Sequence, residues 1–253
     1  MKNIIKKILN FIGFSLIRIN KEIKNIDFND LLKKKISPNP IIFDVGGNSG
    51  QSIEKFKQIF KNPIIHSFEP IESEFKKMKE KFGNDENIYL NNFALGEKDG
   101  LKEFYITAKS SNSSFNKIKK NTSWLKKRKE ENLVNSEDFI TKKENIKITT
   151  IDNYCLKKKI DRIDLLKIDT QGYEDKVLEG SKISFEKEKV RAVITEIMFD
   201  NVYEKYFSFS DIEKHILPYN FRMVGIDLSN NNLFSGLVFF ADVYYFNKKY
   251  FEL

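Results

Sequence analysis

The stretch that decides the fold runs from Ile41 to Gln51 and reads IIFDVGGNSGQ, and it is followed by SFEP at residues 67–70. The first segment predicts a buried strand, a glycine turn and a helix start, and the second an acid that closes the next strand. Glycines let the backbone approach a ligand closely, and Glu69, 25 positions beyond Asp44, can accept hydrogen bonds from a ribose. The pattern predicts a nucleoside site. The alternative is an ordinary strand-turn-helix with incidental glycines.

The residue pattern of the turn narrows the choice of ligand. A dinucleotide fingerprint, G-x-G-x-x-G, seats a pyrophosphate on a helix N-terminus. This turn instead begins with an acid and reads D-x-G-x-N-x-G from Asp44 to Gly50. The Asp44 carboxylate would repel a pyrophosphate, and it suits a ligand that carries ammonium and sulfonium charges. We therefore expect S-adenosylmethionine as the cofactor rather than a nicotinamide dinucleotide.

Composition bounds the class of protein. The 253 residues are 40% hydrophobic and 13% aromatic, which is enough for a buried core, and the net charge of +8 allows an anionic partner. Only five of the 44 basic residues are Arg, whereas nucleic-acid readers favour planar Arg forks, so coding bias explains the lysines better. A nucleic-acid partner is therefore not expected. The single cysteine, Cys155, excludes an internal disulfide and a cysteine-based zinc cluster and suits a reducing cytoplasm.

The first eighteen residues have helical periodicity. Apolar residues recur at positions 4, 5, 8, 12 and 16, and Lys2, Lys6 and Lys7 flank them. One interpretation is a helix that lies on the anionic inner face of a membrane, and the other is a helix packed on the domain's own core. No apolar run is long enough to span a bilayer. We take residues 1–38 as an N-terminal basic helical segment and residues 39–253 as the main domain.

The rest of the chain alternates apolar strands with amphipathic helices, which is the α/β pattern. We expect strands at residues 41–45, 64–68, 88–94, 164–169, 190–197, 221–227 and 237–246, and helices at 28–35, 51–60, 71–82, 174–179 and 209–217. A short polar link joins the last two strands, so they should form an antiparallel hairpin. The predicted fold is α/β and doubly wound, with a mostly parallel seven-stranded sheet that ends in an antiparallel hairpin. This Rossmann-like topology is typical of class I methyltransferases.

The alternation breaks down between Lys98 and Asp152. Strand-like segments at 101–107 and 146–151 enclose a polar stretch, residues 109–143, around Trp124. A stretch of this length without clear regular structure predicts a lid or a mobile insertion. Its basic run, residues 117–129, predicts either a solvated helix face or a patch that meets an anionic acceptor.

Several segments resemble the FkbM-type methyltransferase family. They are ITTID at 148–152, IDLLKIDTQGYE at 163–174, VLEG at 177–180, DVGGNSGQ at 44–51, EP at 69–70 and NFALG at 92–96. The resemblance covers roughly residues 40 to 245 and leaves out the N-terminal helix and the lysine-rich insertion. It implies a class I fold that uses S-adenosylmethionine to methylate a hydroxyl oxygen, typically of a glycan, a glycolipid or a natural product. Gly47 stands where such families usually carry Ala, a change expected to leave the turn intact.

Ligands of open α/β sheets bind outside the carboxyl ends of the strands. We expect the acid and the turn after the first strand to face the methionine end, the acid after the second to face the ribose, and the residues after the third to face the adenine rim. The candidate cofactor-binding residues are Asp44, Gly46, Gly47, Asn48, Gly50, Gln51, Glu69, Pro70, Asn92 and Ala94.

The next two strands are expected to carry the chemistry. Lys167 and Asp169 share one face of their strand because they are two residues apart, and Glu196 ends the neighbouring strand. Methyl transfer to a hydroxyl needs a base, and we assign Asp169 to this role with Lys167 and Glu196 orienting or tuning it. Alternatively, Asp169 and Glu196 could ligate Mg²⁺, although two carboxylates alone do not establish a metal site. His66 is expected in the core, and His215 in a late helix.

Gln171, Tyr173 and Glu174 follow the catalytic strand. They could bind the acceptor or cap the next helix, and the sequence gives no reason to choose.

The predicted function is S-adenosylmethionine-dependent O-methylation of a sugar hydroxyl in a surface glycan, a glycolipid or a related precursor. The alternatives are a nucleic-acid methyltransferase, which only the positive charge favours, and a noncatalytic membrane-associated module that keeps the nucleoside site. Base N-methylation usually relies on an Asn/Asp-Pro-Pro-Tyr-type loop, whereas the corresponding loop here reads DTQG at residues 169–172. Expected partners are a glycan acceptor and an anionic membrane surface, with the protein in the cytoplasm. The pattern defines neither the acceptor position nor the oligomeric state.

Overall fold

The structure is a computed structural model that describes residues 27–131, 139–199, 202–205, 208–228 and 238–251. The helix expected over the first eighteen residues lies outside this part of the chain. None of the helices in the described residues is long and apolar enough to cross a membrane.

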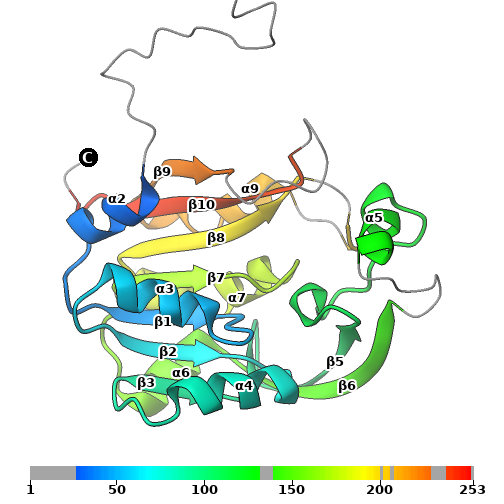
Figure 1. The fold of residues 1–253 in the computed structure, drawn as a ribbon. Helices are drawn as coiled ribbons and strands as arrows, with labels where there is room; N and C mark the ends of the chain where they lie inside the picture. The colour runs from blue at the N-terminus through cyan, green and yellow to red at the C-terminus, as the bar shows by residue number, and fades with distance from the viewer. Residues whose placement is uncertain (1–26, 132–138, 200–201, 206–207, 229–237, 252–253) are drawn as a thin grey trace, which may run out of the picture.

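A seven-stranded sheet forms the centre of the molecule, in the order β3-β2-β1-β7-β8-β10-β9 (Figure 1). The strands are β1 (Ile41–Val45), β2 (Ile64–Phe68), β3 (Ile88–Asn91), β7 (Leu165–Ile168), β8 (Ala192–Met198), β9 (Phe221–Asp227) and β10 (Phe240–Asn247). The first five in the spatial order pair in parallel, and β10 is antiparallel to both β8 and β9. The predicted fold class, including the terminal antiparallel hairpin, is confirmed.

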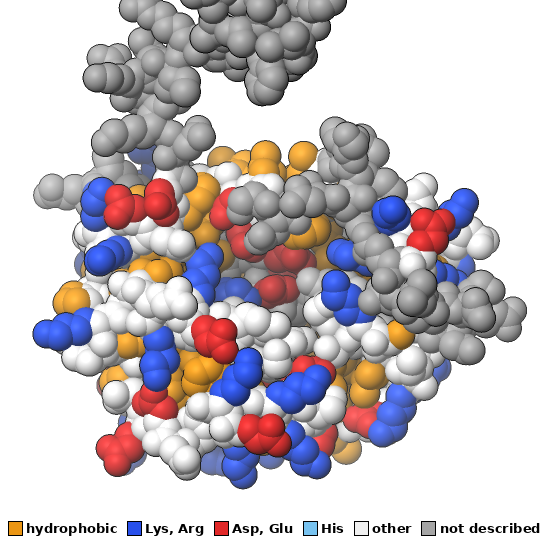
Figure 2. Space-filling model, viewed as in Figure 1, with side chains coloured by type: hydrophobic (Ala, Val, Ile, Leu, Met, Phe, Trp, Pro, Cys, Tyr) orange, Lys and Arg blue, Asp and Glu red, His pale blue; other side chains and the backbone are white. Residues whose placement is uncertain are grey.

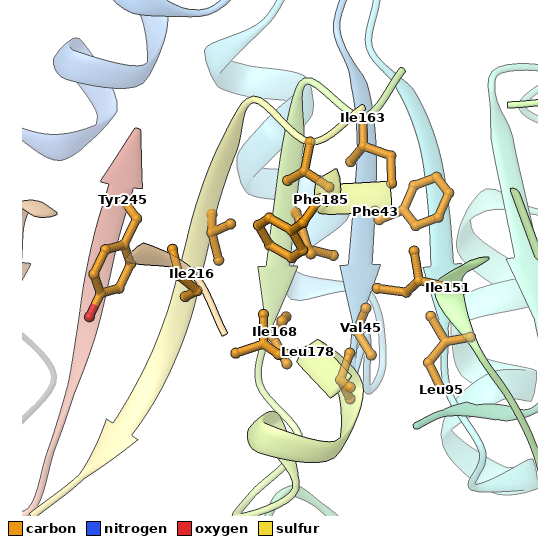
Figure 3. Close-up of a cluster of buried hydrophobic side chains, with 14 of the residues drawn as sticks. Phe43, Val45, Leu95, Ile151, Ile163, Ile168, Leu178, Phe185, Ile216 and Tyr245 are labelled. Atoms are coloured by element: carbon orange, nitrogen blue, oxygen red, sulfur yellow. The ribbon is translucent and has the colours of Figure 1, made fainter. Parts of the chain in front are cut away.

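Helices cover both faces of the sheet. Phe43 and Val45 of β1 point to one face, where they join a core with Ile168 and with residues of α6 (Ile151–Lys158), α7 (Glu174–Glu179), α8 (Lys182–Glu186) and α9 (Phe209–Glu213). Figure 3 shows Phe43, Val45 and Ile168 next to Leu178 and Phe185 in this core. β1 is a nearly continuous apolar run because both of its faces are buried.

Ile42 points to the opposite face, together with Leu165 and Tyr244. Three helices cover this side: α2 (Phe28–Lys35), α3 (Gln51–Ile59) and α4 (Glu72–Phe82). Phe28 of α2 stacks on Tyr244 with ring centroids 4.3 Å apart, and Leu32 is fully buried. Residues 28–35 therefore pack on the sheet of the main domain, although they were predicted to belong to the N-terminal segment.

The polar side chain at the end of β1 lies on this same face. Asp44 is two residues beyond Ile42, so the alternation that buries Ile42 also buries Asp44 between the sheet and α3. The register pairs Asp44 with Lys167 of β7 and with Ser67 of β2. Polar groups at neighbouring strand ends are in this way brought together beneath the glycine turn.

A second, three-stranded sheet in the order β4-β6-β5 flanks the insertion, residues 109–143. Its strands are β4 (Ala94–Leu95), β5 (Gly100–Thr107) and β6 (Ile140–Thr149), and Figure 1 shows β5 and β6 curving away beside the main sheet. Residues 109–143 were expected to lack regular structure, but they contain a 3₁₀ turn, η1 (Ser110–Asn112), a helix, α5 (Ser123–Glu131), and the first residues of β6. The insertion is also fastened to the main domain, because Lys119 N donates to Val202 O and Asn116 Nδ2 to Gly172 O.

Some boundaries differ from the predictions. The third strand ends at Asn91 rather than at residue 94, and the helix predicted for 209–217 is shorter, with a 3₁₀ turn, η2 (Leu217–Tyr219), after it. Helices α6 and α8 were not predicted. The strand expected at 146–151 ends at Thr149, because the Thr150 hydroxyl caps α6 by accepting a hydrogen bond from Asn153 N.

Candidate active site

The glycine turn after β1 packs directly on the end of β7. Gly46 has φ +87°, and a Cβ at this position would lie 1.9 Å from Asp169 O, so no other residue fits without moving the backbone. The amides of Gly46 and Gly47 both donate to Phe68 O at 3.0 Å. Gly50, with φ +94°, begins α3. The turn therefore ties together the three strand ends that face the ligand side of the sheet.

Gly47 is matched to its neighbour on β2. A Cβ at Gly47 would lie 2.1 Å from Ser67 Oγ and 3.1 Å from Asp44 Oδ2. Ser67 Oγ is held there because it donates a hydrogen bond to Asp44 Oδ2 at 2.9 Å. The turn is therefore formed with glycine at this position, whereas an alanine would require the Ser67 hydroxyl to move.

Glu69, after β2, is buried with 4% of its surface exposed. Its Oε2 accepts from Asn48 N at 2.8 Å and its Oε1 from Ile71 N at 2.7 Å. Burial raises the pKa of Glu69 to about 7, although the hydrogen bonds from Ile71 and Asn48 lower it. Because Glu69 also lines the main cavity, its carboxylate can accept further hydrogen bonds from ligand hydroxyls, as predicted for a ribose.

The residues after β3 have two different positions. Ala94 lines the cavity, as does Pro70. Asn92 does not line it, because its amide is directed to the backbone, where Nδ2 donates to Glu69 O at 3.0 Å and to Pro70 O at 3.3 Å. In the structure Asn92 thus holds the segment that carries Glu69.

Asp44 and Lys167 form the buried base of the site. Lys167 Nζ lies 3.7 Å from Asp44 Oδ1 and 3.3 Å from Asp169 Oδ2. Burial raises the pKa of Asp44, and the nearby Lys167 ammonium opposes this. Burial also lowers the pKa of Lys167, but Asp169, Asp44 and Asp242 more than offset it, so that the net shift is upward. Lys167 is therefore held as an ammonium among carboxylates, and neither it nor Asp44 lines the cavity.

The predicted catalytic carboxylates meet through one amide. Gln171 Nε2 donates to Asp169 Oδ1 at 3.0 Å and to Glu196 Oε2 at 2.8 Å. Burial and the charge of Asp169 raise the pKa of Glu196 well above its usual range, which favours its protonated form. Asp169, Gln171 and Glu196 all line the cavity. The convergence expected from the sequence is present, with Lys167 behind Asp169.

The turn that carries Gln171 is held by a buried acid. Glu174 is 1% exposed, and its carboxylate accepts from Thr170 N at 2.7 Å and from Gly172 N at 3.0 Å. Burial raises the pKa of Glu174 to about 7. Gln171 has φ +55° and Gly172 φ +92°, so this support holds the turn in a left-handed conformation. Glu174 therefore holds the turn before α7 and does not cap that helix, whose N-cap is Tyr173.

One cavity of about 230 Å³ joins the cofactor end to the carboxylates (Figure 2). Figure 2 shows red carboxylate side chains gathered in a hollow of this face. The floor of the cavity is formed by strand ends, and its roof comes largely from the insertion, which was not predicted to be part of the site. The roof residues are Phe104, Ser110, Ser111, Asn112, Ser113, Phe115, Trp124 and Arg128. Met198, Val202, Phe239 and Phe240 close the side next to Glu196.

The two histidines lie away from this cavity. His66 is buried, stacks on Tyr89 and shares a hydrogen bond with the Tyr154 hydroxyl. Burial lowers the pKa of His66 to about 4. Neither His66 nor His215 lines the cavity, so neither is placed to take a proton from a ligand there.

The described residues contain no group of three or more His, Cys, Asp or Glu side chains placed to hold a metal ion. Between Asp169 and Glu196 lies the Gln171 amide N–H group, and Asp169 is also contacted by the Lys167 ammonium. Both neighbours are hydrogen-bond donors. This arrangement suits the handling of a proton better than the all-oxygen shell that Mg²⁺ prefers.

The residues present fit S-adenosylmethionine. The buried Glu69 carboxylate lies in the cavity wall, and the Gly46 backbone forms a close approach where a side chain has no room. Asp44 adds a buried negative charge beneath the turn, and its Oδ1 has no hydrogen-bond partner in the described part of the chain. These features match a ligand with ribose hydroxyls at one end and positive charge at the other.

A sheet of this order, with glycine turn and acids at the strand ends, defines a methyltransferase of the class I fold. The family model described as the methyltransferase FkbM domain matches residues 44–223, and the chain belongs to this family. It is 25% identical over 169 residues to 2-O-methyltransferase NoeI of Sinorhizobium fredii (strain NBRC 101917 / NGR234), a match that covers 66% of this chain and 67% of that protein.

The fold also resembles that of a solved structure. The crystal structure of methyltransferase FkbM from Methylobacillus flagellatus KT matches with a TM-score of 0.55 and 12% identity over 91% of this chain. This chain spans about half the length of that one, 47%. The structure of Aeropyrum pernix fibrillarin with natively bound S-adenosyl-L-methionine matches with a TM-score of 0.45 and 10% identity, over 86% of this chain and 73% of that one.

Proposed function

We propose that this methyltransferase uses S-adenosylmethionine to methylate a sugar hydroxyl in a glycan, a glycolipid or a related precursor. The observation that carries the proposal is the single cavity that joins Glu69 to the cluster of Asp169, Gln171 and Glu196. A donor bound at one end and an acceptor at the other would share one enclosed space. Such an arrangement favours an in-line transfer by positioning.

The cofactor half binds by complementary groups. The Glu69 carboxylate accepts hydrogen bonds from the ribose hydroxyls. The turn at Gly46 leaves room for the methionine end of the cofactor, above the negative charge of Asp44. When bound, S-adenosylmethionine supplies a methyl group that its sulfonium makes electrophilic. Lys167 carries positive charge on the far side of Asp44 and Asp169, and it keeps these carboxylates from repelling each other.

The acceptor half handles one proton. As the hydroxyl oxygen takes the methyl group, its proton passes to Asp169, and the S–CH₃ bond breaks to leave S-adenosylhomocysteine. Lys167 fixes Oδ2 of Asp169 and Gln171 fixes Oδ1, so the position of the carboxylate is set on both sides. Glu196, whose pKa is raised by burial and by Asp169, then offers a hydroxyl that can donate to an acceptor oxygen.

The cavity wall suits a sugar. Trp124 and Phe115 present buried aromatic faces, and the run Ser110–Ser113 presents hydroxyls and an amide. A sugar offers C–H faces to the aromatic rings and hydroxyl edges to the polar run, which is the mixed lining that orients a small ligand. The 25% identity to a protein named a 2-O-methyltransferase supports transfer to oxygen.

Transfer of label from methyl-labelled S-adenosylmethionine tests the proposal. Sugar nucleotides, lipid-linked glycans and RNA should be offered separately, with and without EDTA. We expect label in a base-stable methyl ether of a sugar acceptor. Label only in RNA, or none in any sugar acceptor, would contradict the proposal. Activity abolished by EDTA and restored by Mg²⁺ would instead support the metal role for Asp169 and Glu196.

A further inference from the structure

Asn112 has a buried amide with an unsatisfied oxygen. It lies in the 3₁₀ turn η1 (Ser110–Asn112), the tip of the insertion, and is 5% exposed. Its Oδ1 is fully buried, and it has no hydrogen-bond partner among the residues that the structure describes. Asn112 also lines the main cavity. Because a buried amide oxygen without a partner is costly, its retention in a cavity wall indicates a ligand that donates to it.

The tip of the insertion lies at the cofactor half. Ser110, two residues before Asn112, accepts a hydrogen bond from Asn48 Nδ2 at 3.5 Å. The backbone amide of the same Asn48 donates to Glu69 at 2.8 Å. Thr107 N donates to Ser113 Oγ, which closes the base of the tip. Asn112 is thus held close to the residue expected to bind the ribose.

An adenosine needs a further acceptor besides Glu69. Its donors are the ribose hydroxyls, which Glu69 can accept, and the 6-amino group of the adenine. The sequence placed Asn92 at the adenine rim, but the Asn92 amide is bonded to the carbonyls of Glu69 and Pro70 and lies outside the cavity lining. Asn112, by contrast, is a buried amide residue of the cavity lining, and its Oδ1 has no hydrogen-bond partner among the described residues.

We propose that Asn112 binds the adenine of S-adenosylmethionine. Its Oδ1 accepts from the 6-amino group and its Nδ2 donates to an adjacent ring nitrogen, the two-point pairing by which Asn recognises adenine elsewhere. This inference rests on the proposed cofactor. It makes the insertion part of the cofactor site as well as the roof of the cavity, so that cofactor binding and the position of the insertion are coupled.

Calorimetric binding of S-adenosylhomocysteine and S-inosylhomocysteine tests this pairing, because the 6-oxo group of inosine cannot donate to Oδ1. The wild type should prefer the adenosyl ligand about tenfold, equivalent to about 1.4 kcal/mol. Asn112→Leu should bind the adenosyl ligand about tenfold more weakly and lose the preference. Its melting temperature should equal or exceed that of the wild type, because the replaced oxygen has no partner in the described chain. Asn145→Ala, at an exposed position on β6, is the matched control and should behave as wild type.

The failures are distinguishable. If Asn112→Leu keeps the wild-type affinity and preference, the inference is overturned while the proposed function stands. A change confined to the KM of the sugar acceptor would also overturn it, because the amide would then contact the acceptor. If the wild type binds neither ligand, the proposed function fails and the inference falls with it.

Discussion

Cofactor binding should weaken about tenfold when the pH falls from 8 to 6. Burial raises the pKa of Glu69 to about 7, so the unliganded carboxyl is roughly nine-tenths ionised at pH 8 and roughly one-tenth ionised at pH 6. Ribose hydroxyls donate to the ionised form. Below the raised pKa the ligand must first displace a proton, and the lost affinity is about 1.4 kcal/mol over this range.

The structure explains why the proton leaves on binding. The amides of Asn48 and Ile71 already donate to Glu69 and favour its ionised form, while burial opposes them. Two further donors from a ribose shift this balance towards the carboxylate. Calorimetry of S-adenosylhomocysteine in buffers with different ionisation enthalpies should therefore show a proton released near pH 6 and almost none at pH 8.

Two variants separate Glu69 from other titrating groups. Glu69→Gln should bind about 1.5–3 kcal/mol more weakly at pH 8, the range for a hydrogen bond to a charged group, and its affinity should not vary between pH 6 and 8. Glu174→Gln is the control, because burial also raises the pKa of Glu174 to about 7 but this side chain does not line the cavity. It should keep the wild-type pH dependence. A constant wild-type affinity over this range, or an unchanged slope in Glu69→Gln, would refute the reasoning.

Three further outcomes are expected. Gln171→Leu removes the amide between Asp169 and Glu196, the two carboxyl groups proposed to act in catalysis, so kcat should fall at least about tenfold with little change in cofactor Kd. An equal loss of kcat and of cofactor affinity would contradict this positioning role. Gly47→Ala should lower the free energy of unfolding by about 1–3 kcal/mol through overpacking, and adding Ser67→Ala should restore part of this free energy. If the effects of the two substitutions on the free energy of unfolding simply add in denaturant melts, the contact between the two residues is contradicted. We propose that the first eighteen residues bind anionic membranes, so deleting residues 1–19 should abolish salt-sensitive vesicle binding and keep cofactor affinity. Unfolding of the truncated protein would instead indicate that these residues belong to the core.

Much of the main sheet could be predicted from local pattern. β1, β2 and β9 begin and end at the predicted residues, and the glycine turn and the acid after β2 mark the ligand side. The sequence also predicted the proximity of Lys167, Asp169 and Glu196, because side-chain alternation and the order of neighbouring strands determine which strand ends meet.

The roof of the cavity could not be predicted, because its signals are weak. Helix α5 is largely polar, and Trp124 and Leu125 are its buried residues among the side chains that are described. The apolar alternation at 146–151 predicted a strand where α6 begins, although Thr150 is a residue type that commonly caps helices, and here it accepts a hydrogen bond from Asn153 N.

Individual side-chain contacts could not be predicted from the sequence. The match between Gly47 and Ser67 depends on the distance between two parallel strands, and the burial of the Asn112 amide depends on how the tip of the insertion packs. Asn92 follows β3 as expected, but whether its amide faces the ligand or the backbone is decided only by the folded segment around Glu69. Such choices depend on three-dimensional packing rather than on periodicity.

The central claim is that Asp169 takes the proton of an acceptor hydroxyl in the cavity that also holds the cofactor. Single-turnover methyl transfer from labelled S-adenosylmethionine to a sugar acceptor, measured in the wild type and in Asp169→Asn, tests it most directly. The account predicts that the variant binds S-adenosylhomocysteine within about twofold of the wild type and transfers methyl at least about 10²-fold more slowly, the usual effect of losing a general base. A transfer rate equal to that of the wild type at matched cofactor occupancy would contradict it.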